Sequence, residues 1–134
     1  MTPKVAPCLW FNGEAEAAAH LYVSLFPRTS SVTNVTRHGE GQRFPAGTAM
    51  LVEFVVDGAR WQALNGGPDY PHSAAVSFSV DCEDQTEVNR LWAAFIADGG
   101  AAGRCGWLTD RFGVSWQIVP RGMGAFLGGT DAAG

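Results

Sequence analysis

The stretch from Val5 to Phe26, VAPCLWFNGEAEAAAHLYVSLF, decides the fold because its outline returns in Ala75–Ile96, AVSFSVDCEDQTEVNRLWAAFI. Each copy begins with a short apolar run typical of a β-strand and continues through a turn that holds acidic residues. Each then has the apolar spacing of an amphipathic helix. The repetition predicts two modules with the same topology in one chain.

The two helices are predicted from apolar positions that recur at i, i+3, i+4 and i+7. We expect Asn12 to cap the first helix and Pro27 to end it. Asp84, followed three residues later by Glu87, has the spacing of a capping box for the second helix. The two apolar stripes are Ala15, Ala18, Ala19, Tyr22, Leu25 and Phe26 in the first helix, and Val88, Leu91, Trp92 and Phe95 in the second.

Three further strands are predicted after each helix. Asp57-Gly58, between Ala49–Val56 and Ala59–Asn65, is the strongest hairpin signal in the chain and pairs Phe54 with Trp61. The other predicted strands are Ser31–Thr36 in the first module and Cys105–Thr109 and Val114–Pro120 in the second, with a weak strand before Cys105. Two βαβββ modules predict an α+β fold in which each sheet packs one face on its helix and the other faces line a shared concave surface.

Length and composition limit the class of protein. The chain has 134 residues, 46% of them hydrophobic and 16% charged, which fits one folded domain rather than a disordered chain. Its uncharged runs, such as Ala17–Pro27, are too short for a membrane span. The net charge is −4, Lys4 is the only lysine and the arginines are dispersed, which argues against nucleic-acid binding. We expect a cytoplasmic protein with three reduced cysteines, Cys8, Cys82 and Cys105, since no signal peptide is recognised.

Four segments carry a resemblance to a known family. Pro7–Gly13, Ala63–Pro68, Val76–Val80, and Cys105–Leu108 followed by Asp110–Gln117 resemble the PhnB-like branch of the glyoxalase/bleomycin-resistance, or vicinal oxygen chelate, superfamily. This branch is also called 3-demethylubiquinone 3-methyltransferase-like. The glycine-rich strand-to-helix turn that the usual S-adenosylmethionine enzyme needs does not follow a predicted strand here.

The resemblance implies the glyoxalase/bleomycin-resistance-type fold. From the sequence we expect a single domain over 1–134, with module one at about 4–68, module two at about 73–121 and a frayed tail at 122–134. The resemblance also implies paired modules, within one chain or between two. The unprotected strand Ser31–Thr36 and the apolar segment Met123–Leu127 give a physical reason to expect a homodimer. Related chains continue into a C-terminal helix, whereas this chain ends soon after Leu127.

Strand alternation, combined with the superfamily's metal positions, predicts which side chains face the cavity. At the positions where metalloenzymes of the superfamily carry their metal ligands, this chain has Ala6 or Cys8, Ala63, Ala75 or Ser77, and Gln117. We therefore expect neither a metal nor another cofactor. Cys8, His72 and Gln117 are the side chains that leave this question open. The candidate ligand-binding residues are Trp10, Phe54, Trp61, Asn65, Ser77, Ser79, Cys105, Trp107, Ser115 and Gln117.

These residues favour a metal-independent protein that binds a small molecule, because aromatic walls with a few neutral polar groups are typical of such sites. Whether the chain is an enzyme stays open, and no catalytic residue is assigned. One alternative is a lyase, isomerase or dioxygenase that uses a divalent metal in an incomplete site. Another is a dimerising interaction module without a ligand.

Overall fold

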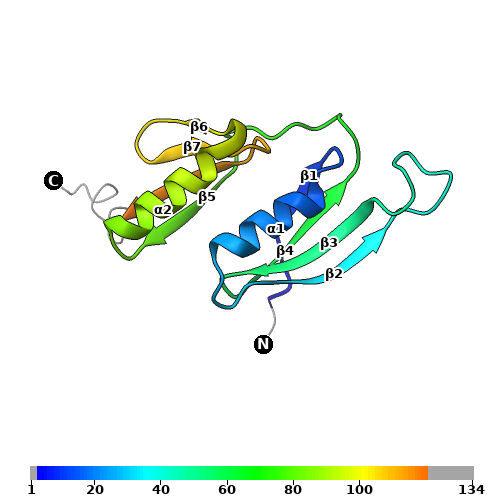
Figure 1. Ribbon diagram of the computed structural model, residues 1–134, viewed down its shortest axis with the longest axis horizontal. Helices are drawn as coiled ribbons and strands as arrows, with labels where there is room; N and C mark the ends of the chain where they lie inside the picture. Colours follow the sequence, from blue (N-terminus) through cyan, green and yellow to red (C-terminus); the bar gives the residue numbers. More distant parts are fainter. Residues whose placement is uncertain (1–2, 121–134) are drawn as a thin grey trace. The chain divides into compact units, whose positions relative to one another are not determined.

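A computed structural model describes residues 3–120 of the chain. The chain divides into two compact units between Pro71 and His72. Each unit has the order strand, helix and three strands, as Figure 1 shows, so the repetition predicted from the sequence is confirmed. The predicted tail at 122–134 and the segment Met123–Leu127 lie outside the described residues.

The first unit is a four-stranded sheet with one helix across one of its faces (Figure 1). The strand order is β1-β4-β3-β2, with β1 parallel to β4 and the other neighbours antiparallel. The elements are β1 (Cys8–Phe11), α1 (Ala15–Leu25), β2 (Ser31–Arg37), β3 (Ala49–Val56) and β4 (Ala59–Asn65).

The second unit repeats this topology. Its strand order is β5-β8-β7-β6, with β5 parallel to β8. The weak strand expected before Cys105 is a two-residue strand, β6. The elements are β5 (Ser77–Cys82), α2 (Gln85–Ile96), the short helix η1 (Ala97–Gly99), β6 (Ala101–Ala102), β7 (Trp107–Thr109) and β8 (Ser115–Pro120).

The predicted hairpin and the second helix cap are confirmed. Asp57 and Gly58 both have positive φ, 50° and 82°, as a two-residue turn of this kind requires, and Phe54 pairs with Trp61. At the start of α2 the Asp84 carboxylate accepts a hydrogen bond from the backbone N–H of Glu87 at 2.9 Å. The Glu87 carboxylate in turn accepts one from the backbone N–H of Glu83 at 2.8 Å.

The cap predicted for the first helix is wrong. The residue before α1 is Glu14, and no side chain near it in sequence caps the helix. Instead the Oδ1 atom of Asn65, at the end of β4, accepts a hydrogen bond from the backbone N–H of Ala15 at 3.0 Å. Its Nδ2 atom donates to the carbonyl of Ala49 at 2.8 Å. The last residue of β4, which is distant in sequence, thus supplies the cap that was expected from Asn12.

Each helix packs on its own sheet through aromatic rings. In the second unit the rings of Phe95 on α2 and Trp116 on β8 have centroids 4.5 Å apart, and Phe78 on β5 lies 5.5 Å from Trp116. Trp92, expected in this core, is only half-buried. Phe78 and Trp116 therefore lie on the helix side of the second sheet.

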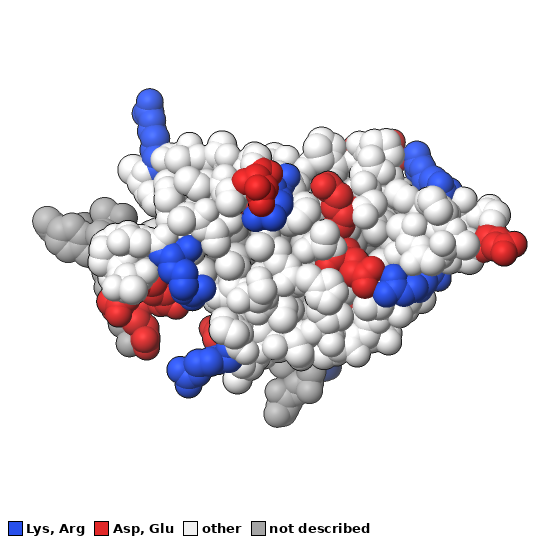
Figure 2. Space-filling view, in the orientation of Figure 1, with Lys and Arg blue, Asp and Glu red and all other residues white. Residues whose placement is uncertain are grey.

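Charged side chains do not gather in a basic patch on the face shown in Figure 2, where Lys and Arg residues stand apart from one another. None of the helices among residues 3–120 is long and apolar enough to cross a membrane.

Candidate functional site

Three of the four candidates in the first unit lie on the helix side of the sheet, so the face predicted for them is wrong. The Tyr22 ring on α1 lies 6.5 Å from that of Phe54 and 6.4 Å from that of Trp61, centroid to centroid. Asn65 is 4% exposed because it caps α1. The parallel pairing of β1 with β4 explains this orientation. Leu9 and Phe11 are in register with Ala63 and Asn65, so these four side chains lie on the same face of the sheet. Phe54, Trp61 and Asn65 therefore hold the core together.

Trp10 is the candidate of the first unit that lies on the face opposite α1. Its indole Nε1 donates a hydrogen bond to the carbonyl of Gly67 at 2.8 Å. The ring lies directly over Gly66, where an added Cβ would come within 2.3 Å of it, and it meets the edge of Tyr70 at a centroid distance of 4.8 Å. The Gly66–Tyr70 loop thus fixes the orientation of this indole.

The second unit gathers its candidates into one patch on the sheet face opposite α2. Pairing places Trp107, Gln117 and Ser79 in one row across β7, β8 and β5. A second row holds Thr109, Ser115 and Ser77. Paired residues of neighbouring strands project on the same side of a sheet, and their neighbours Phe78 and Trp116 face α2. We call these six residues the neutral patch.

The polar groups of the neutral patch are only partly engaged by the protein. The Gln117 side chain donates from Nε2 to the Ser77 hydroxyl at 3.0 Å. The hydroxyls of Ser79, Thr109 and Ser115 and the indole N–H of Trp107 make no side-chain hydrogen bond to another residue of the described range 3–120. Ser79 is exposed, whereas Ser115, in the middle of its row, is 5% exposed. The patch therefore offers hydrogen-bonding groups beside an indole.

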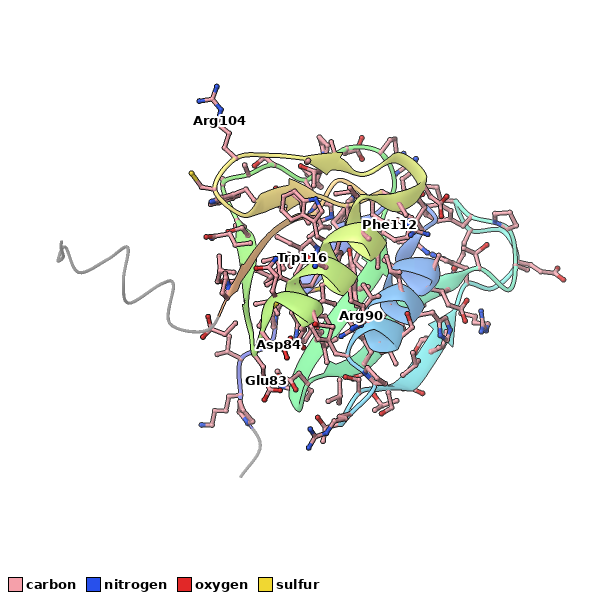
Figure 3. The ribbon with its side chains drawn as sticks, turned by 60° about the vertical axis from the view of Figure 1, so that its left-hand side comes forward. Glu83, Asp84, Arg90, Arg104, Phe112 and Trp116 are labelled. Carbon is pink, nitrogen blue, oxygen red and sulfur yellow. The ribbon has the colours of Figure 1, made fainter. Side chains whose placement is uncertain are left out.

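Thr109 belongs to the patch although the sequence analysis did not select it. It pairs directly with Ser115, so the strand pairing alone could have identified it. Cys105 lies before β7 in the turn that joins β6 to β7, as an exposed residue with a positive φ of 55°. Figure 3 shows the neighbouring Arg104 extending away from this turn. Cys105 is thus placed at the turn and not in either row of the patch.

Asp110 is a turn residue between β7 and β8. Its buried carboxylate accepts hydrogen bonds from the backbone N–H groups of Phe112 and Val114 at 2.8 and 3.1 Å. It also accepts one from the indole Nε1 of Trp116 at 3.0 Å, a residue labelled in Figure 3. These contacts hold the start of β8, and with it Ser115 and Gln117, in register.

The described side chains, those of residues 3–120, bring together few ligands for a divalent metal ion. Among residues 3–120 no group of three His, Cys, Asp or Glu side chains is placed to hold a metal ion. The neutral patch contributes hydroxyls, an indole and one amide, which are weak ligands for a divalent ion. Burial raises the pKa of the Cys8 thiol, which disfavours the thiolate that a metal ion would bind. His72 lies beside Gly113, a residue of the turn before β8. It is outside the two rows of the patch.

Comparisons with known proteins agree with this fold. The chain is similar to the PhnB protein of Bacillus cereus, provisionally assigned as a 3-demethylubiquinone-9 3-methyltransferase, with 26% identity and a TM-score of 0.78 over 88% of this chain and 99% of that one. It is similar to protein PA1353 of Pseudomonas aeruginosa, with 24% identity and a TM-score of 0.66 over 90% and 98%.

The chain is less similar to the fosfomycin resistance protein FosX of Listeria monocytogenes, whose structure was solved with Mn(II). The identity is 13% and the TM-score 0.55, over 87% of this chain and 90% of that one. At that identity the likeness concerns the fold alone. A glyoxalase/bleomycin resistance protein of Albidiferax ferrireducens has the same TM-score. No curated protein matches the chain in sequence.

The family assignment rests on the sequence profile described as 3-demethylubiquinone-9 3-methyltransferase, which matches residues 3–119. That span contains both units and nearly all of the described residues. The chain therefore belongs to the 3-demethylubiquinone-9 3-methyltransferase-like, or PhnB, family and has the glyoxalase/bleomycin-resistance-type fold.

Proposed function

We propose that the protein binds a small molecule on the neutral patch of its second unit, without a resident metal ion. The observation that carries this proposal is the set of hydroxyls beside the Trp107 indole, on the face opposite α2, that make no side-chain hydrogen bond within residues 3–120. Small-molecule sites combine an apolar surface with a few polar groups that fix orientation. Trp107 supplies the apolar surface, and Ser79, Thr109 and Gln117 supply the polar groups.

Methyl transfer, which the family description names, is not supported by the residues present. In the usual methyltransferase fold a glycine-rich turn leads from a strand into a helix and leaves room for the cofactor. Here Gly66-Gly67 follows β4 but leads into Pro68 and a loop, and the Trp10 ring already occupies the space beside Gly66. We derive no methyl-transfer step for this chain.

A thermal-shift screen of the purified protein tests the binding proposal. A compound that binds the native state stabilises it by RT ln(1 + [L]/Kd) and therefore raises the melting temperature. We expect hits whose shift is lost in Trp107→Leu and kept in Trp92→Leu. The second variant is a matched control, because Trp92 lies on α2 and on the other side of the same sheet. If no compound shifts the wild-type protein, the proposal fails.

The metal-dependent alternative is tested separately by elemental analysis. We expect no stoichiometric Zn, Ni, Mn or Fe in purified protein, because the neutral patch offers hydroxyls and one amide as donors. A tightly bound ion that is lost in Gln117→Ala would contradict metal independence and favour a lyase, isomerase or dioxygenase.

A homodimer remains part of the proposal, together with a cytoplasmic location. The supporting feature is β2, a seven-residue strand at the edge of the first sheet with no proline. A register shift near Thr33 and the charge of Arg37 give this edge some protection against pairing. Sedimentation equilibrium decides the matter, since a mass near 14.2 kDa at all concentrations would exclude a dimer.

A further inference from the structure

We infer that the neutral patch selects an uncharged ring compound whose hydroxyl or carbonyl groups stand in a 1,3 relation. This inference rests on the proposed function and narrows it to a chemical class of ligand. It is carried by three features of the second unit: the absence of charge in the patch, the placement of one carboxylate beside it, and the spacing of its polar groups.

Apart from Asp81, the charged side chains near the patch in the described part of the second unit pair with other groups or point away from it. Arg111 pairs with Asp98 at 3.3 Å, and Arg90 pairs with Glu87 on α2 at 3.9 Å. Arg104 extends away from the turn between β6 and β7 (Figure 3). The Asp110 carboxylate is used by the backbone and by Trp116. A charged ligand would therefore lose its water on the patch without gaining an opposite charge from any of the six patch residues.

Asp81 determines whether the patch binds anionic or cationic ligands more weakly. It is the only charged residue in the strands described for the second unit, which end at Pro120. It follows Ser79 by two residues on β5, so it lies on the same face, one row beyond the patch, where it pairs with Val119. Its carboxylate repels an anion bound at Ser79 and offers a weak attraction to a cation. Anions should therefore bind worst.

The hydrogen-bonding groups match hydroxyl and carbonyl partners. A serine or threonine hydroxyl both donates and accepts, and the Gln117 Oε1 atom accepts while its Nε2 atom is held by Ser77. Gln117 and Ser79 stand on neighbouring strands, which are separated by ~4.8 Å. Oxygen substituents in a 1,3 relation on a six-membered ring have a similar separation. The ring itself then lies against Trp107, the third member of the row.

Three compounds with one ring and different charges test the inference. These are 3,5-dihydroxybenzamide, which is neutral, 3,5-dihydroxybenzoate, which is an anion, and 3,5-dihydroxybenzylamine, which is a cation at pH 7. Isothermal titration calorimetry on the full-length protein measures each dissociation constant. We expect the benzamide to bind at least about tenfold more tightly than the benzoate, with the benzylamine between them. The heat of benzamide binding should be lost in Trp107→Leu and kept in Trp92→Leu.

The variant Asp81→Asn is the control for charge. It should tighten benzoate binding and leave benzamide binding unchanged, because it removes repulsion without touching the six patch residues. Equal or tighter binding of benzoate or benzylamine than of benzamide overturns the inference. If none of the three binds while the thermal-shift screen yields Trp107-dependent hits, the ligand class is wrong and the proposed function stands. If the screen also yields no hits, both are wrong.

Discussion

Asn65, the last residue of β4, caps α1 by accepting a hydrogen bond from the backbone N–H of Ala15 at 3.0 Å. The same side chain donates to the carbonyl of Ala49 on β3 at 2.8 Å. One buried amide thus joins the helix of the first unit to two of its strands. A residue that the sequence places among the ligand-binding candidates has a structural role here.

Replacing Asn65 by alanine should therefore destabilise the protein. Two buried backbone groups would lose their partners, at a cost of about 2–3 kcal/mol in the free energy of unfolding. Urea denaturation measures this change. Asn12→Ala is the matched control, because Asn12 is exposed and makes no cap, so its effect should stay within about 0.5 kcal/mol. Equal losses in both variants would mean that Asn65 does not cap α1.

Gly66→Ala should be destabilising for a steric reason. An added Cβ would lie 2.3 Å from the Trp10 ring, so the indole would have to move and would lose its hydrogen bond to Gly67. We expect a cost of about 1–3 kcal/mol, as for other overpacked sites. In a Trp10→Leu background the same substitution should cost much less, and a double-mutant cycle measures the difference. An equal cost in both backgrounds would contradict the contact.

The ion pair between Glu16 on α1 and Arg37 on β2 should make stability depend on pH. Both carboxylate oxygens accept hydrogen bonds from the guanidinium at 2.9 Å, and these bonds, with the positive charge, lower the pKa of Glu16. A lowered folded-state pKa stabilises the fold above the usual glutamate pKa of about 4.3, and this contribution is lost as the pH falls through the folded-state value.

The variant Glu16→Gln should accordingly be less stable than the wild type at pH 7. The difference should vanish once the pH lies below the folded-state pKa of Glu16. Urea midpoints measured at a series of pH values provide the comparison. A stability difference that does not change on acidification would show that the carboxylate charge is not its source.

The three cysteines should differ in reactivity towards a thiol reagent. Cys82 is fully buried, and burial together with the nearby Glu87 carboxylate raises its pKa to about 11. Since the thiolate is the reactive form, Cys82 should not react in the native protein. Titration with a disulfide reagent should label the exposed Cys8 and Cys105 in the native protein and Cys82 only after unfolding, and Cys82→Ala should remove the phase that requires unfolding. Three fast thiols would contradict the burial of Cys82.

The hairpin shows how far the sequence could predict this fold. Asp57-Gly58 predicts the pairing of Phe54 with Trp61 correctly, because the turn fixes the register. Alternation along the strands then separates two faces but does not say which one lies under the helix. That choice depends on the parallel pairing of β1 with β4, which joins Leu9 to Ala63 across a long stretch of sequence. The sequence therefore predicts the wrong side of the sheet for the face that carries Phe54 and Trp61.

In the second unit, alternation along the strands predicts the two faces of the sheet correctly because these faces differ more in polarity. Trp116 and Ile118 alternate with Ser115 and Gln117, so burial of the apolar pair leaves the polar pair on the opposite face. The cap of α1 could not be predicted, since Asn65 lies 50 residues from Ala15 and no local pattern connects them.

The binding of a small molecule on the neutral patch is tested most directly by the indole N–H resonances of 15N-labelled protein. The protein is titrated with the compound that gives the largest thermal shift, and each of the five tryptophan signals is assigned by substitution. We expect the Trp107 signal to move with the ligand concentration while that of Trp116, on the helix side of the same sheet, stays in place. Movement of the Trp116 or Trp61 signal with an unchanged Trp107 signal would contradict this expectation.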